Sequence, residues 1–123
     1  MKKKISAAKL LKKITKEKDL VWRIAVKERD KYECQVCQKK VVGINAQAHH
    51  LIPRSFKDFR WDIDNGICLC FSCHAIGRFS AHINGIFFAE LLKKNRPELY
   101  AHAIENINRI YPMYENLLSA SKQ

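Results

Sequence analysis

The chain has 123 residues, of which 23 are Lys or Arg and 12 are Asp or Glu, giving a formal net charge of +11. This length corresponds to a single domain with a core of modest size. The charge disfavours a cationic or uncharged partner and favours a polyanion, of which nucleic acid is the commonest. The alternatives are a basic protein with no polyanionic partner and one that binds anionic membrane surfaces.

No run of residues approaches the roughly 18 apolar positions that a membrane-spanning helix needs, so we expect no membrane partner. Lys9, Lys12 and Lys13 interrupt the stretch that would form the apolar core of a secretory leader. The chain has five cysteines, an odd number, and four of them form two Cys-x2-Cys pairs. Such pairs are typical of metal binding in a reducing compartment rather than of disulfides, which favours the cytoplasm.

Residues 6–30 predict one or two basic amphipathic helices, with a break near Lys18 and Asp19 in the second case. The apolar positions are Leu10, Leu11, Ile14, Leu20, Trp22, Ile24, Ala25 and Val26. The basic positions Lys2, Lys3, Lys4, Lys12, Lys13, Lys16 and Lys18 form an arm. The arm either grips phosphates without reading sequence or is a solvated helix face.

The two cysteine pairs, Cys34 with Cys37 and Cys70 with Cys73, are separated by 32 residues. Together they offer four thiolates at the corners of a tetrahedron, which is the ligand set of a closed structural zinc site. Cys68, the odd cysteine, fits a small buried hydrophobic residue.

Between the cysteine pairs, residues 41–44 suit a turn between short strands, and residues 46–52 predict a strand that ends at Pro53. Residues 54–64 are charged and aperiodic, which indicates a loop. Asn65 and Gly66 suit a turn that leads into the second pair. His74 is expected at the start of a helix after that pair, or within it.

Residues 86–94 and 97–119 predict helices, with Pro97 in a first helical turn. An apolar stripe runs along the second one: Tyr100, Ile104, Ile107, Tyr111, Tyr114 and Leu118. The simplest interpretation is a stripe that packs on the domain's own core, although a dimer seam has the same pattern. Monomer and dimer therefore both stay open. His102 fits a surface or packing position.

The order His50, Asn65, His74 between two cysteine pairs resembles the HNH endonuclease family, especially small phage-type members whose zinc knuckles flank a ββα-metal core. The resemblance covers about residues 29–82. It implies an α+β fold with a small ββα-metal core stapled by a four-cysteine zinc site and flanked by N-terminal and C-terminal helices. We expect one domain over residues 1–123, divided into a basic helical arm (1–28), the HNH core (29–82) and a helical tail (83–123).

His50 is the candidate general base, because a histidine titrates near neutral pH and its neutral form can take a proton from water. Neighbouring residues of a strand point to opposite sides, so His49 and His50 should not share one task. The resemblance makes His49 and His74 ligands of a catalytic divalent cation, Mg²⁺, Mn²⁺, Ni²⁺ or Zn²⁺. His82, eight residues after His74, is a further candidate ligand.

Asn65 cannot titrate, and the resemblance leaves two roles for it: it fixes the loop that orients the base, or it helps to bind metal. A simple turn role is the alternative. Arg54, Arg60 and Arg78 flank the site, and arginine suits phosphate oxygens. Arg54 is the first choice for a catalytic contact with the phosphate, since it lies four residues after His50.

These residues together predict a metal-dependent endonuclease that hydrolyses DNA, with RNA as an alternative substrate, through a histidine-activated water. The resemblance implies products with 5′-phosphate and 3′-hydroxyl ends, a phage-like protein in the host cytoplasm, and a possible phage packaging partner. The absence of a long recognition element predicts low sequence specificity. The rival function is a non-catalytic, zinc-stapled module that binds nucleic acid, which explains the charge and the cysteines but not the spacing of His50, Asn65 and His74.

Overall fold

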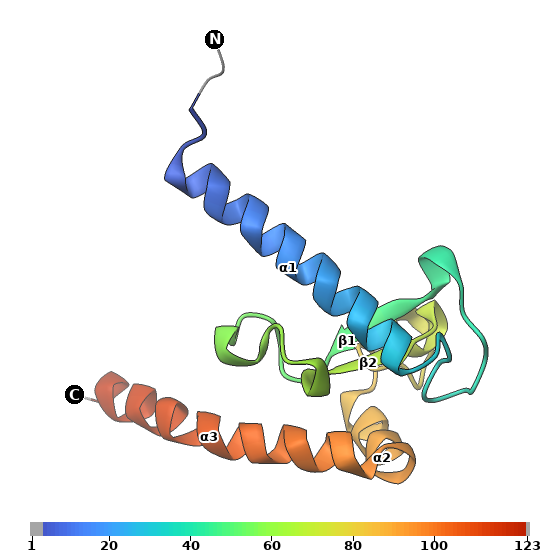
Figure 1. Ribbon diagram of the computed structural model, residues 1–123. Helices are drawn as coiled ribbons and strands as arrows, with labels where there is room; N and C mark the ends of the chain where they lie inside the picture. The colour runs from blue at the N-terminus through green and yellow to red at the C-terminus, as the bar shows by residue number, and fades with distance from the viewer. Residues whose placement is uncertain (1–3, 123) are drawn as a thin grey trace.

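The computed structural model describes residues 4–122, so Lys2 and Lys3 of the expected basic arm lie outside the described residues. Its elements are α1 (Ala7–Arg29), β1 (Gln47–His50), β2 (Gly66–Leu69), α2 (Gly85–Asn95) and α3 (Pro97–Ser121), with short helical turns between them. The two strands form one antiparallel sheet. Figure 1 shows α1 on one side of this sheet and α2 with α3 on the other. The fold is therefore α+β with a small ββα core and flanking helices, as the sequence predicts.

Helix α1 runs unbroken from Ala7 to Arg29, so the break considered near Lys18 and Asp19 is wrong. Neither glycine nor proline interrupts this stretch, and the Ser6 hydroxyl caps the helix by accepting a hydrogen bond from the Lys9 N–H at 3.2 Å. Of its apolar residues only Trp22 and Val26, one turn apart, are buried. The N-terminal half of α1 extends past the sheet (Figure 1).

The strand pairing places His50 opposite Gly66 and His49 opposite Ile67. A single turn of 3-10 helix ends at Asn65, and Gly66 already begins β2 with an extended backbone, so the expected turn includes Asn65 but not Gly66. A Cβ atom at Gly66 would lie 2.5 Å from the Trp22 ring and 2.6 Å from a Val26 methyl. Helix α1 thus packs directly on the backbone of β2, and the missing side chain makes room for Trp22 beside His50.

The other side of the sheet carries the main core. Ile67 and Leu69 of β2 form one cluster with Phe88, Leu92 and Leu99 of α2 and α3. The Asn84 side chain caps α2 by accepting a hydrogen bond from the Phe87 N–H at 3.1 Å. The core therefore sits between β2 and the two C-terminal helices.

Helix α3 packs inward through residues beside the expected apolar stripe, and of the stripe itself Tyr100 packs against the core cluster. Its buried residues are Leu99, Ala103 and Asn106, whereas Tyr111 and Tyr114 are 53% and 55% exposed. The expected packing of the whole stripe on the domain's own core is therefore wrong. The C-terminal part of α3 extends beyond the small sheet, so no core covers its apolar residues there (Figure 1).

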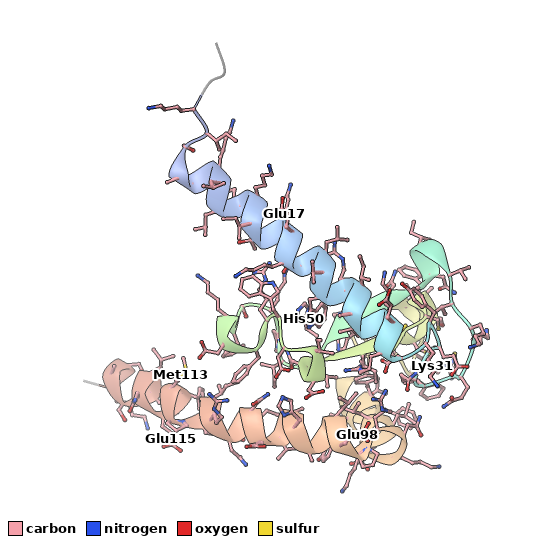
Figure 2. The ribbon with its side chains drawn as sticks, in the orientation of Figure 1. Glu17, Lys31, His50, Glu98, Met113 and Glu115 are labelled. Carbon is pink, nitrogen blue, oxygen red and sulfur yellow. The ribbon has the colours of Figure 1, made fainter. Side chains whose placement is uncertain are left out.

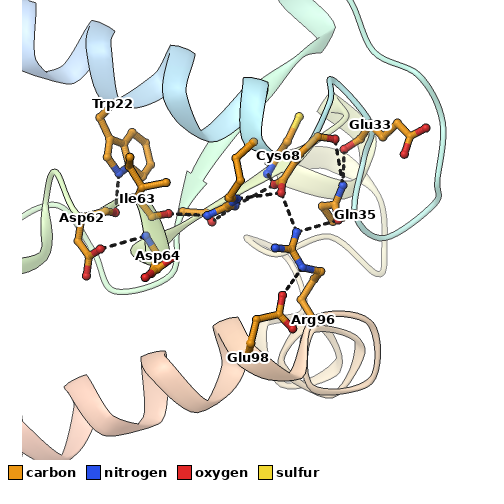
Figure 3. A network of polar contacts seen from close by, with 12 residues as sticks. Trp22, Glu33, Gln35, Asp62, Ile63, Asp64, Cys68, Arg96 and Glu98 are labelled. Carbon is orange, nitrogen blue, oxygen red and sulfur yellow. Dashed lines mark hydrogen bonds and ion pairs between the residues drawn. The ribbon is translucent and has the colours of Figure 1, made fainter.

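A buried carboxylate, Asp30, joins α1 to the sheet and to α3. It is 4% exposed, pairs with Arg29 at 2.9 Å and Arg96 at 2.7 Å, and accepts a hydrogen bond from the Cys68 N–H at 2.8 Å. Burial by itself would raise the pKa of Asp30, but these hydrogen bonds outweigh it and lower the pKa. Figure 3 shows Arg96 reaching from the start of α3 into this network.

Among the described residues, no helix combines the length and the apolar character needed to cross a membrane.

Candidate active site

The four cysteines of the two Cys-x2-Cys pairs meet in space. Their Sγ atoms all lie within 4.8 Å of one another, and those of Cys37 and Cys70 are 3.8 Å apart. A tetrahedron with Zn–S bonds of about 2.3 Å has edges of about 3.8 Å, so this group fits a zinc ion. Cys68 is fully buried outside the group, as expected for a small hydrophobic residue.

The surroundings of the sulfurs support a thiolate at one corner. Burial would raise the pKa of Cys34, but backbone N–H donors of Cys37, Cys70 and Val36 outweigh it and lower the pKa. Burial, followed by the neighbouring sulfurs, raises the pKa of Cys73. Such a group ionises fully only when a cation offsets its charge.

Three histidines form a second cluster on the α2 side of the sheet. His49, from β1, lies with its ring centroid 5.0 Å from those of His74 and His82, and one ring nitrogen of each of the three lies within 4.8 Å of the others. His49 also meets the Phe88 ring edge to face at 5.5 Å. The structure thus brings together the two candidate ligands and His82.

Hydrogen bonds orient these rings. The Gln47 side-chain oxygen contacts Nδ1 of His74, and the Nε2 atoms of His74 and His82 face each other at 3.0 Å. An amide oxygen only accepts, so Nδ1 of His74 carries the proton and its Nε2 offers a lone pair. Gln47 precedes His49 by two residues on the same face of β1, which is how the strand places both near His74.

Electrostatics favour the neutral form of two of these histidines, His49 and His74. Burial, reinforced by the nearby His74, His82 and His50, lowers the pKa of His49 to about 3. Burial and then His82 also lower the pKa of His74. Neutral imidazoles whose ring nitrogens converge are suited to a divalent transition metal.

His50 points to the other side of β1, under α1 (Figure 2). Its ring stacks on Trp22, with centroids 3.8 Å apart and planes 8° from parallel, and its Nε2 lies 2.9 Å from the Arg60 carbonyl oxygen. Because a carbonyl only accepts, Nε2 carries the proton and Nδ1 is left as the basic nitrogen. Burial lowers the pKa of His50 although the Arg60 carbonyl raises it.

The partners of His50 are fixed in turn. The Trp22 Nε1–H donates to the Asp62 carbonyl at 2.7 Å (Figure 3). The Arg60 guanidinium forms a two-point pair with Asp19 at 2.9 and 2.7 Å. Helix α1 and the loop after β1 thus hold the imidazole between them.

Asn65 is fully buried and holds this loop rather than reaching the histidine cluster. Its side-chain oxygen accepts from the Ile52 N–H at 2.8 Å, and its amide nitrogen donates to the carbonyls of Ile52 at 2.9 Å and Phe59 at 3.1 Å. The next carbonyl along the chain is that of Arg60, which orients His50. All polar atoms of the Asn65 side chain are engaged in these bonds, which favours the positioning role.

The three candidate arginines differ in their surroundings. Arg60 is paired with Asp19, whereas Arg54 and Arg78 are exposed and form no ion pair within residues 4–122. Arg54 lines an open groove with Lys12 and Lys16 of α1. His102 lies outside the cluster, where its ring nitrogen is 2.7 Å from an Asp62 carboxylate oxygen.

The family model described as HNH endonuclease matches residues 34–76. Over this segment the chain is therefore similar to the HNH endonuclease family. The match contains both cysteine pairs, His49, His50, Asn65 and His74, and it ends before His82. Comparison with curated proteins gave no match, and comparison with solved structures gave none either.

The sequence alone did not indicate Trp22, Gln47 or the Arg60 carbonyl as parts of the HNH site. The signal for Gln47 is its two-residue spacing from His49 on a strand. Trp22 lies in a helix outside the family segment, and a backbone carbonyl leaves no mark in a sequence.

Proposed function

We propose that this HNH protein is a metal-dependent endonuclease that hydrolyses phosphodiester bonds of DNA. The observation that carries the proposal is the convergence of His49, His74 and His82 on one side of β1, while the next residue, His50, presents an oriented basic nitrogen on the other. A binding module without catalysis has no need for either arrangement.

His50 is proposed to take the proton from the attacking water at Nδ1. The Arg60 carbonyl then keeps its hydrogen bond to Nε2–H and stabilises the imidazolium that forms. The low pKa of His50 keeps the ring neutral, and thus able to accept a proton, at neutral pH. Asn65 positions the loop that carries this carbonyl.

His49, His74 and His82 are proposed to hold the catalytic cation. A divalent cation there would stabilise the negative charge that develops on the phosphate and on the leaving oxygen. The donors are imidazoles rather than carboxylates, so Mn²⁺, Ni²⁺ or Zn²⁺ suits this set better than Mg²⁺. Arg54 remains the proposed contact to the phosphate.

Zinc at Cys34, Cys37, Cys70 and Cys73 is proposed as a structural ion. It would join the loop before β1 to the end of β2. Residues 1–28, 29–82 and 83–123 are proposed as arm, HNH core and tail of one domain.

The wider setting rests on the HNH resemblance and on the paired cysteines. We place the protein in a reducing cytoplasm, that of a host cell if it is phage-encoded, with low sequence specificity and a packaging protein as a possible partner. A unique cleavage site in a randomised plasmid library would contradict the low specificity.

The test is plasmid nicking by zinc-loaded protein in Mg²⁺, Mn²⁺, Ni²⁺ and EDTA. We expect metal-dependent nicking that His50→Ala reduces by about 10²-fold or more, while His102→Gln, a histidine change outside the site, leaves it near wild type. Absence of nicking in every metal, together with salt-sensitive DNA binding, would instead identify the non-catalytic module.

A further inference from the structure

An open groove of about 450 Å³ runs between α1 and the loop that follows β1. One wall is formed by α1 and the other by the loop. Its lining residues are Leu11, Lys12, Thr15, Lys16, Asp19, Arg54 and Arg60. Arg60 also bounds the candidate active site, because its carbonyl holds His50. The groove therefore extends from the protruding half of α1 to the loop whose Arg60 carbonyl holds the proposed base.

The charges of this groove are unbalanced in favour of a bound anion. Both oxygens of Asp19, its one acidic residue, are engaged by Arg60, and Oδ1 also accepts a hydrogen bond from the Trp61 Nε1–H at 2.9 Å. Lys12, Lys16 and Arg54 have no carboxylate within ion-pair distance anywhere in residues 4–122. Three cations thus face the groove without an internal partner.

The spacing of the cations suits a repeating anion. Lys12 and Lys16 are one helical turn apart, an axial rise of about 6 Å. Two nucleotides of one strand rise by about 6.8 Å along a duplex axis. By contrast, the larger hollow on the other flank of α1, about 560 Å³, carries one acidic and one basic side chain, Glu17 and Lys18, among apolar ones. That hollow has no excess charge with which to select a polyanion.

We propose that this groove binds the phosphate backbone of the nucleic-acid strand that leads to His50, through Lys12, Lys16 and Arg54. Helix α1 is then part of the binding surface of the nuclease and not only a support for Trp22. The contacts are to phosphates, so they raise affinity without selecting sequence. The proposal rests on the proposed nuclease function, whose substrate it places on the molecule.

The test compares two variants in a His50→Ala background, which prevents cleavage during the measurement. The groove variant combines Lys12→Ala, Lys16→Ala and Arg54→Ala. The control combines Lys93→Ala and Lys94→Ala, exposed basic residues at the end of α2 on the other side of the sheet (Figure 1). Binding of a fluorescent duplex and of the matching single strand is followed by anisotropy between about 50 and about 200 mM salt. Bound zinc and the melting temperature verify that both variants are folded.

We expect the groove variant to bind at least about tenfold more weakly at the lowest salt and to lose about 2 to 3 from the slope of log K against log salt. The control should lose less than half of this slope. Equal affinities and slopes for the groove variant and its parent would overturn the proposal, and so would equal losses in the groove variant and the control.

Nicking measured with His50 restored separates this proposal from the proposed function. If wild-type protein nicks plasmid and the groove variant nicks and binds equally well, the nuclease stands and the groove assignment falls. If wild-type protein never nicks but the groove variant alone loses affinity and salt slope, the groove stands and the nuclease assignment falls.

Discussion

Replacing Asn65 by alanine tests how the loop that orients His50 is held. The change removes three hydrogen bonds, to the N–H and carbonyl of Ile52 and to the carbonyl of Phe59, inside a fully buried site. Each buried backbone group left without a partner costs about 1 to 3 kcal/mol. With partial relaxation, we expect the free energy of unfolding to fall by about 3 to 6 kcal/mol, a large part of the roughly 5 to 15 kcal/mol typical of a domain.

The assay is thermal unfolding of zinc-loaded protein, followed by far-UV circular dichroism at one zinc concentration. A loss of this size should lower the melting temperature by about 10 to 20 °C. Asn45→Ala is the matched control, because exposed Asn45 makes one such bond, from the Phe71 N–H at 2.9 Å. We expect it to cost about 1 kcal/mol or less.

Asn65→Asp distinguishes positioning from metal binding. Aspartate keeps the acceptor for the Ile52 N–H but turns a buried carboxylate toward two carbonyls, so we expect it to be at least as destabilising as alanine. A metal ligand would tolerate aspartate, since a carboxylate binds divalent cations well. Wild-type stability and nicking in Asn65→Asp, or a loss below about 1 kcal/mol in Asn65→Ala, would refute the positioning argument.

Two further predictions concern the zinc group and the proposed base. Cys34→Ser should lose the bound zinc and its cooperative unfolding transition, as measured by zinc content and thermal melts. Cys68→Ala should keep the zinc, and its free energy of unfolding should fall by about 1 to 2 kcal/mol. Full zinc content in Cys34→Ser would contradict the zinc assignment. His50, whose pKa is lowered by burial, should titrate below the ordinary value of about 6.5 in NMR of protein without the catalytic cation, with the signal assigned by its loss in His50→Ala. A lower pKa leaves more neutral His50 at a given pH, so nicking should persist below about pH 6.5. A titration midpoint of His50 at or above about 6.5 would argue against a buried environment that lowers its pKa.

The spacing of residues in the HNH segment was enough to predict which side chains could bind metal or act as a base. The spacing within the two cysteine pairs predicts a metal site, because a two-residue gap suits two ligands of one tetrahedral ion. These cysteines are Cys34, Cys37, Cys70 and Cys73. The alternation of a strand separates His49 from His50 before any coordinates are known. The flanking helices also follow from local periodicity, whereas the small ββα core was implied by the resemblance to the HNH family.

The groups that these residues meet come from distant parts of the chain and became known only from the folded structure. Trp22 reaches His50 because Gly66, opposite it across the sheet, leaves space for the ring, and the Arg60 carbonyl reaches Nε2 through a loop without periodicity. The exposure of Tyr111 and Tyr114 likewise depends on where the small sheet ends, since a helical stripe has the same pattern whether or not another surface covers it. Local sequence patterns indicate the secondary structure around a residue and the chemical roles open to its side chain. Its contact partners depend on how segments far apart in the chain pack together.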